Sequence, residues 1–168
     1  MNEVAGFSKF YEEYEQPLYR FLLALSRDSH MAEELTQETF YQAFLHIDRF
    51  EGRCSVFAWL CQIGKNAYFK ECRRKKREVS VQDVPEGLSP SGGDPADALA
   101  EREQAERLRW HLAHLPPPYR DVFTLRVYGA LSFHEISQLY GKTESWARVT
   151  YYRAKEKLLD ALEQEDGL

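Results

Sequence analysis

Hydrophobic residues recur at intervals of three and four along most of the chain, a spacing that places them on one face of an α-helix. The first such stripe comprises Phe7, Phe10, Tyr11, Tyr14, Leu18, Phe21, Leu22 and Leu25. Sustained alternation of polar and apolar residues, the pattern of a half-buried strand, is lacking. The pattern therefore predicts an all-α protein. Pro17 falls inside the first stripe and is expected to kink or split that helix.

Two further helices are expected before residue 78. Asp28 or Ser29 can cap one that runs to about Ile47, with an apolar side formed by Met31, Leu35, Phe40, Phe44 and Ile47. After a loop at 48–55, another is expected at 56–77. Pro, Gly and Ser then cluster, a composition typical of a linker. We therefore expect two small helical domains, residues 1–78 and 96–168, joined by a flexible linker at 79–95.

Helix start and stop signals also divide the segment after the linker. Asp94-Pro95 can open a helix that runs to about Leu115, where three prolines follow. A short helix at 119–128 should end at Gly129. The C-terminal domain therefore begins with one long and one short helix.

The last part of the chain has the signals of a helix-turn-helix motif. Ser132 and Glu135 match a capping box that opens a short helix, Gly141 can end it, and Thr143 can cap a longer basic helix. Such a helix fits the major groove of DNA with its N-terminal residues at the base edges, and free backbone N–H groups there can bind phosphate. An ordinary helical hairpin with a solvated basic face is the alternative.

The net charge of −5 conceals strongly segregated charge. Residues 65–77 hold seven bases and one acid, and residues 142–157 hold five bases and two acids, whereas residues 1–51 hold ten acids and four bases. An acidic protein can therefore still present two basic surfaces, so the overall charge does not argue against nucleic acid as a partner.

The first basic segment mixes cations with aromatic and amide side chains, which suits a single strand whose bases stack on rings. Burial of the aromatic residues is the alternative, and for Trp59 it is favoured by alignment with apolar neighbours. The acidic and amide-rich stretch at 33–40 has a similar ambiguity. It is either a solvated helix face or a docking surface for a basic partner helix.

Catalytic and metal-binding patterns are lacking. The five histidines are scattered, the three cysteines have no metal-ligand spacing, and no Gly-rich phosphate loop occurs. No apolar run approaches the roughly 20 residues that cross a bilayer. We therefore expect a cytoplasmic binding protein without a cofactor, a metal or a small-molecule substrate, and not an enzyme.

Together these segments resemble the extracytoplasmic-function sigma factors, the smallest class of the bacterial sigma-70 family. Residues 32–40 resemble the family's acidic Gln-Glu-x-Phe signature. The start of the last domain is matched by Leu115-Pro116 with Tyr119-Arg120, and the helix-turn-helix by residues 131–155. The family segment that follows the acidic signature is matched by Phe50-Glu51-Gly52-Arg53, Trp59-Leu60 and Asn66.

The resemblance implies binding to core RNA polymerase, at the β′ clamp coiled coil and the β flap, and to promoter DNA. Polymerase contacts would come from Glu34, Leu35, Gln37, Glu38 and Phe40. The melted −10 element would be held by Arg53, Lys65, Asn66, Lys70, Arg73 and Arg74, with Asn66 at a flipped-out base. The duplex −35 element would be read by Thr143, Ser145, Arg148, Val149, Tyr152 and Arg153.

The resemblance also implies an anti-sigma factor, often membrane-anchored, that restrains both domains. The chain departs from the family pattern at Lys142, at Ser145-Trp146-Ala147 and at Thr150, which affects the expected −35 preference. Trp146 could fill the core or approach DNA. Two rival hypotheses remain: a helix-turn-helix regulator that never enters polymerase, and a helical interaction protein with incidental basic patches.

Overall fold

The computed structural model describes residues 2–78 and 95–167, and within these ranges it is entirely helical. The first range contains α1 (Asn2–Ser26), α2 (Ser29–His46), the 3₁₀ turn η1 (Ile47–Arg49) and α3 (Val56–Glu78). The second contains α4 (Pro95–His114), α5 (Tyr119–Val127), α6 (Phe133–Tyr140) and α7 (Glu144–Asp166). The all-α prediction is confirmed. The predicted linker lies outside the described residues, apart from Pro95.

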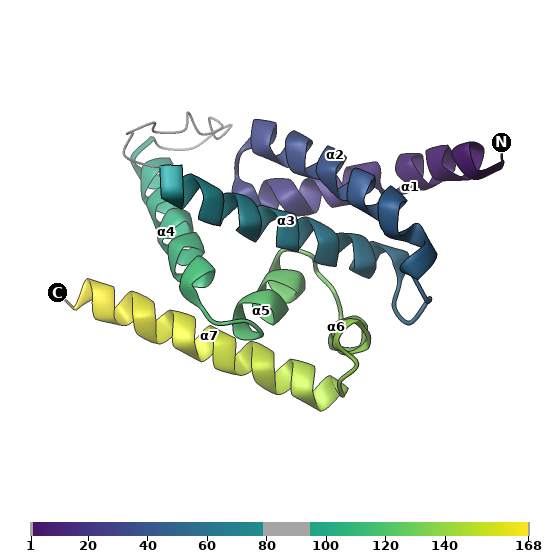
Figure 1. Cartoon of the computed structure of the whole chain (residues 1–168). Coiled ribbons are helices and arrows are strands. Elements are labelled where there is room, and N and C mark those ends of the chain that lie inside the picture. Colours follow the sequence, from purple (N-terminus) through teal and green to yellow (C-terminus); the bar gives the residue numbers. More distant parts are fainter. Residues whose placement is uncertain (1, 79–94, 168) are drawn as a thin grey trace.

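The helices α1, α2 and α3 pack against one another as one unit (Figure 1). Gly64 allows α3 to approach its neighbours closely. A Cβ atom at this position would lie 3.2 Å from Thr39 Oγ1 and 3.3 Å from Leu22 Cδ2. The interior of this three-helix unit is apolar, and the fully buried side chains include Leu18, Leu22, Leu25 and Leu60.

The helix α1 continues through Pro17, so the predicted split does not occur. Pro17 lies on the exposed side of the helix. Proline removes one backbone hydrogen bond, to the carbonyl four residues earlier. On the exposed side water can solvate that carbonyl, which is why the helix tolerates the residue.

The helices α4 to α7 form the second unit, in which α7 packs against each of the other three. The predicted helix-turn-helix is present as α6 and α7. Ser132 Oγ accepts from the Glu135 N–H and the Glu135 side chain accepts from the Ser132 N–H, which completes the capping box. Gly141 ends α6 in the left-handed region at φ 62°, and Thr143 caps α7.

The two units lie in contact with each other. The helix α3 crosses between them, with α1 and α2 on one side and α5 and α6 on the other (Figure 1). At a second point the guanidinium of Arg109 donates from Nη1 to the backbone oxygen of Ser26 at 2.7 Å. The sequence alone gave no orientation between the units, and this packing determines which predicted site residues are accessible.

Candidate nucleic-acid interface

The exposed face of α7 brings together most of the residues predicted to read duplex DNA. Arg148, Val149, Tyr152 and Arg153 are all exposed, and they line one shallow groove. The intervals of one, three and one residues place all four on the same side of the helix. Ser145 is exposed at the N-terminal end of this helix.

Two of the residues near this face have structural roles. The hydroxyl of Thr143 accepts from the Trp146 N–H at 3.1 Å, so it caps α7. The Trp146 ring is half-buried, with its centroid 5.5 Å from that of Tyr140, which supports a packing role. Thr150 is buried, so its difference from the family pattern lies inside the fold and away from the predicted DNA-binding residues.

The basic end of α3 carries Lys70, Arg73 and Arg74, all exposed. They line a groove shared with α2, where Glu34 and Glu38 form part of the opposite wall. Arg74 donates to the carboxylate of Glu71 at 3.1 and 3.2 Å from Nε, and this hydrogen bonding lowers the pKa of Glu71. Exposed cations of α3 and exposed acids of α2 therefore lie side by side here.

The loop before α3 holds the predicted strand-binding residue Arg53. Its side chain is 81% exposed and pairs with Glu51 at 2.8 Å. An exposed pair of this kind contributes little to stability, so Arg53 can exchange its partner for a phosphate at small cost.

Lys65 lies in the interior, unlike the other predicted DNA-binding cations. Its side chain is 1% exposed, and its Nζ lies 3.1 Å from Oδ2 of Asp121, a residue of α5 that is itself 12% exposed. The same Nζ donates to Oδ1 of the exposed Asn66 at 2.9 Å. Burial lowers the pKa of Lys65, and the Asp121 carboxylate opposes that shift. In this arrangement Lys65 is not accessible to DNA.

Further contacts cover the same side of α3. Ser55 Oγ donates to Glu135 Oε2 at 3.2 Å, and Tyr140 OH donates to Gln62 Oε1 at 3.3 Å. The guanidinium of Arg120 lies 4.4 Å from the Phe69 ring centroid. The predicted strand-binding helix is therefore partly covered by α5 and α6.

The predicted polymerase-docking residues divide between the two sides of α2. Glu34, Gln37 and Glu38 are exposed, whereas Leu35 and Phe40 are core residues. The predicted apolar side also needs correction, because Phe44 and Ile47 are exposed rather than buried. At the end of α2 the cover is one-sided: the Phe44 ring lies 5.1 Å from that of Phe7 on α1, and half of the Phe44 side chain stays exposed.

Sequence reasoning missed an exposed apolar cluster on α2, formed by Tyr41, Phe44 and Leu45. These side chains are 58%, 52% and 51% exposed. Large apolar residues grouped on a surface are typical of a protein–protein interface. The sequence pattern that could have identified this cluster is its position one helical turn beyond Gln37 and Glu38. That spacing places the cluster next to the acidic face of α2.

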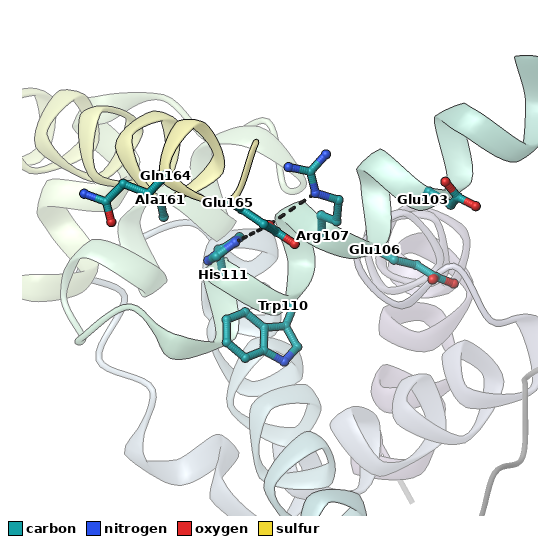
Figure 2. A pocket seen from close by; sticks show the side chains of 8 residues that line it. All are labelled: Glu103, Glu106, Arg107, Trp110, His111, Ala161, Gln164 and Glu165. Atoms are coloured by element: carbon teal, nitrogen blue, oxygen red, sulfur yellow. Dashed lines mark hydrogen bonds and ion pairs between the residues drawn. The ribbon is translucent and has the colours of Figure 1, made fainter. Parts of the chain in front are cut away.

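A separate pocket of about 760 Å³ lies between α4 and α7, away from the residues discussed above. Figure 2 shows its ion cluster: Glu165 pairs with Arg107 at 3.2 Å and with His111 at 2.8 Å. Hydrogen bonds from His111 and Arg107 lower the pKa of Glu165. The cluster joins the two helices.

The described residues contain no cluster of histidine, cysteine and acidic side chains that could hold a metal ion. Among the described helices, none is both long and apolar enough to cross a membrane. Within residues 2–78 and 95–167, the candidate site therefore consists of charged and aromatic surfaces that can contact other molecules.

Comparison with known proteins identifies both units. A family model for sigma-70 region 2 matches residues 10–78, and one for sigma-70 region 4 matches residues 106–158. The ECF RNA polymerase sigma factor SigM of Bacillus subtilis is 32% identical over 152 residues, which cover 89% of this chain and 91% of SigM. The RNA polymerase sigma factor YlaC of the same species is 29% identical, with 88% and 87% covered.

Two solved structures share the fold. One is the sigma factor RpoE in complex with the anti-sigma factor NepR from Bartonella quintana, with a TM-score of 0.58, 21% identity, and 94% and 97% of the two chains covered. The other is CnrH in complex with the cytosolic domain of CnrY, with a TM-score of 0.55, 21% identity, and 94% and 88% covered. With both sigma-70 regions matched and a relative similar over nearly its whole length, the chain belongs to the extracytoplasmic-function sigma factors of the sigma-70 family.

Proposed function

We propose that this sigma factor divides promoter recognition between two cationic surfaces, one for paired DNA and one for a melted strand. The observation that carries this proposal is the placement of the two surfaces on different helical units. Arg148 and Arg153 are exposed on α7, and Lys70, Arg73 and Arg74 are exposed at the end of α3. Bond formation belongs to the polymerase, so the chain needs only to bind and position DNA.

The α7 face is suited to the −35 duplex. A helix following a helix-turn-helix turn enters the major groove, where arginine pairs with guanine through two hydrogen bonds. A good bidentate contact is worth about 1–3 kcal/mol of discrimination against the wrong base. Arg148 and Arg153 are the candidates for such contacts, and Tyr152 and Val149 provide apolar contact area beside them.

The α3 face is suited to the −10 element as a single strand. Its exposed cations can pair with successive phosphates, and the exposed amide of Asn66 can bond the edge of an extruded base. Extruding one base costs a few kcal/mol of unstacking, which these contacts must offset. Lys65 can join this surface only after it separates from Asp121.

Polymerase docking is assigned to α2. The exposed Glu34, Gln37 and Glu38 can pair with a basic helix of the β′ coiled coil, and the neighbouring Tyr41 and Phe44 add apolar area. Aromatic residues concentrate binding energy at protein interfaces, while the surrounding charges control specificity and association rate.

We also infer an anti-sigma partner and action in the cytoplasm, where sigma factors meet polymerase. Support comes from a sigma factor of the same fold, RpoE from Bartonella quintana, whose structure contains the anti-sigma factor NepR. Affinity purification of the tagged chain from its own cells tests this inference. Recovery of polymerase without a second, inhibitory protein would contradict it.

Run-off transcription with core polymerase on genomic promoter fragments tests the function directly. The wild-type chain should start RNA synthesis at defined sites, and Arg148→Ala/Arg153→Ala should lose recognition of the −35 duplex while retaining polymerase binding. Arg20→Ala, an exposed arginine on α1, is the matched control and should behave as wild type. Tight binding to duplex fragments without any transcript would instead indicate a regulator that acts without polymerase.

The role of Asn66 is tested on the same templates. Asn66→Ala should reduce promoter opening, measured by permanganate reactivity of unpaired thymines, more than it reduces polymerase binding. Normal opening by Asn66→Ala would show that the base contact has been assigned to the wrong residue.

A further inference from the structure

We propose that Phe133 positions Arg148 for base reading, so that an aromatic ring outside α7 contributes to the −35 sequence that this sigma factor prefers. The proposal rests on the role proposed above for Arg148, and it adds a residue that has no direct part in that role. The observation from which it starts is that the guanidinium carbon of Arg148 lies 5.3 Å from the centroid of the Phe133 ring.

This distance is within the range of a cation–π attraction, which extends to about 6 Å. Arg148 is exposed, and within the described part of the chain its side chain has no carboxylate partner and no hydrogen bond. The ring is therefore an attractive contact that can restrain this guanidinium before DNA arrives. The attraction acts on the charge and uses none of the N–H donors of the guanidinium, so these stay available for a base edge.

The Phe133 ring is itself held in place. Phe133 is the first residue of α6, directly after the Ser132 cap, and its side chain is half-buried. Its ring centroid lies 5.7 Å from that of Tyr151, which stacks in turn on the buried Phe123 with the centroids 5.9 Å apart. A row of three rings thus leads from the core to Arg148. Because the ring is fixed, it can hold a cation in one place.

A second arginine approaches the same ring. The guanidinium carbon of Arg126, on α5, lies 4.3 Å from the Phe133 centroid, and its Nη1 donates to the backbone oxygen of Leu131 at 3.0 Å. Arg126 is fixed by this hydrogen bond, and like charges repel. The guanidinium of Arg148 is therefore attracted by the ring and repelled by a fixed cation near it, which narrows the positions that it can take.

Restraint of Arg148 before binding should favour its contact with DNA. Ordering a long side chain at an interface costs conformational entropy, and a side chain that is already restrained loses less. Bidentate pairing with guanine also needs the guanidinium in a defined place and orientation. Phe133 is therefore a positioning residue, which acts through Arg148 and strengthens the preference for one base pair without contacting DNA.

A purely structural role for Phe133 leads to different expectations. Loss of packing would lower the free energy of unfolding and would weaken binding to every DNA sequence alike, with Arg148 present or absent. A positioning role requires that the effect disappear when Arg148 is removed, and that it concern the base pair that Arg148 reads. These two differences define the test.

The test compares Phe133→Leu, which removes the ring and keeps an apolar side chain, with Phe133→Tyr, which keeps the ring. Tyr119→Leu is the matched control, because it removes another half-buried ring of the same unit that lies beside a different cation, with Lys157 Nζ 5.0 Å from its centroid. Arg148→Ala is made alone and in combination with Phe133→Leu. Circular dichroism and urea denaturation establish that each variant is folded.

The first measurement uses the full chain without DNA. Protons near the face of an aromatic ring resonate upfield in NMR spectra, so the Nε–H signal of Arg148 reports the contact, and its absence in Arg148→Ala identifies it. We expect this signal to move downfield in Phe133→Leu and to stay close to its wild-type position in Phe133→Tyr and Tyr119→Leu. No movement in Phe133→Leu would overturn the proposal whether or not Arg148 reads DNA.

The second measurement uses each variant with core polymerase and labelled promoter fragments found by run-off transcription. One fragment carries the natural −35 sequence. In the other, one base pair is replaced, chosen as the change that weakens binding of wild type but not of Arg148→Ala, and the measured quantity is the ratio of the two affinities. If no such base pair exists, the proposed function fails at Arg148, and the positioning proposal fails with it.

We expect Phe133→Leu to lower this ratio about two- to fivefold, the factor that corresponds to a cation–π contact of an exposed side chain. Phe133→Tyr and Tyr119→Leu should keep the ratio within about 1.5-fold of wild type. In the Arg148→Ala background, Phe133→Leu should change the affinity for either fragment by less than about 1.5-fold, because the interaction that it removes is already absent.

An unchanged ratio in Phe133→Leu, with discrimination lost in Arg148→Ala, would overturn the proposal and leave the role of Arg148 intact. An equal effect of Phe133→Leu with and without Arg148 would also overturn it, because Phe133 would then act through Arg126 or through the fold. If Phe133→Leu does not fold, Phe133→Met, which fills a similar volume without a ring, takes its place in both measurements, and the same outcomes decide.

Discussion

At the scale of single residues, Glu135 connects two helix N-termini that belong to different units. Its Oε1 accepts from the backbone N–H of Ser132 at the start of α6. Its Oε2 accepts from Ser55 Oγ, which in turn accepts from the Ala58 N–H at the start of α3. Helix N-termini carry a partial positive charge, so a carboxylate placed between two of them is stabilised by both.

Replacing Glu135 should therefore cost more than replacing an ordinary surface acid. We expect Glu135→Ala to lower the free energy of unfolding by about 1 kcal/mol, the usual value of a lost helix cap. Urea denaturation followed by circular dichroism measures the change. Glu156→Ala, an exposed acid on α7, should have almost no effect. Equal stability of the two variants would mean that the hydrogen bonds of the Glu135 carboxylate contribute nothing.

Local signals made several residues predictable. The cap at Asp28, the capping box at Ser132 and Glu135, and the left-handed Gly141 all depend on neighbours within a few positions, and each is found where the sequence indicates. Lys65 differs, because its environment is set by Asp121 in a distant segment. No local pattern distinguishes a lysine that faces solvent from one that meets a carboxylate across a domain contact.

At the scale of helices, α2 has a buried side and an exposed side suited to a partner. The predicted apolar side combined residues from both. Leu35 is 6% exposed, whereas Phe44 is 52% exposed, although both were expected on one apolar side. Helical spacing identifies the stripe, but the length over which α1 and α3 cover it depends on their packing. Near the end of α2, α1 covers Phe44 on one side only, through Phe7.

The two sides should respond differently to truncation. Leu35→Ala should lower the free energy of unfolding by about 2–5 kcal/mol, as expected for a cavity in a packed core. Phe44→Ala should change stability far less and should weaken binding to core polymerase. Chemical denaturation and competition for core polymerase give the two readouts. If Phe44→Ala binds core polymerase as tightly as wild type, the apolar cluster is not part of the docking surface.

The contact between α4 and α7 should weaken in acid. Hydrogen bonds from His111 and then Arg107 hold the pKa of Glu165 below its ordinary value of 4.5 in the folded chain. Because the folded-state pKa is the lower one, the carboxylate contributes stability above pH 4.5, and this contribution disappears as the pH falls through the folded value. Melting temperatures measured from pH 7 downward should fall less steeply for Glu165→Gln than for wild type, and parallel curves would contradict the assignment.

At the scale of the whole molecule, charge segregation explains how a chain of net charge −5 can bind DNA. The cations of the α7 face act locally, since charges separated by more than about 10 Å are largely screened at moderate salt. The all-α architecture and the helix-turn-helix were predictable from spacing and caps. The contact between the two units was not, because it joins individual side chains of segments far apart in the chain.

Binding of the −35 duplex should show the salt dependence of phosphate neutralisation in spite of the negative net charge. The logarithm of the association constant should fall linearly with the logarithm of salt concentration, because each neutralised phosphate releases counterions. Lys155 is an exposed lysine in the same groove and a candidate phosphate contact, so Lys155→Ala should reduce the slope by about 1. Anisotropy titrations at several salt concentrations measure the slope, and a slope near zero would exclude the α7 face as the DNA surface.

The open face of α7 has a consequence for the sequence of events at a promoter. While Lys65 is held by Asp121, the chain can bind a double helix on α7, whereas an unwound strand meets only the part of the α3 surface that stays exposed. Binding of the −35 duplex by α7 would therefore come first. Full binding of the melted −10 strand by α3 would follow only after the two units separate. A sigma factor built in this way would be protected, before it meets polymerase, from capture by unpaired nucleic acid elsewhere in the cell.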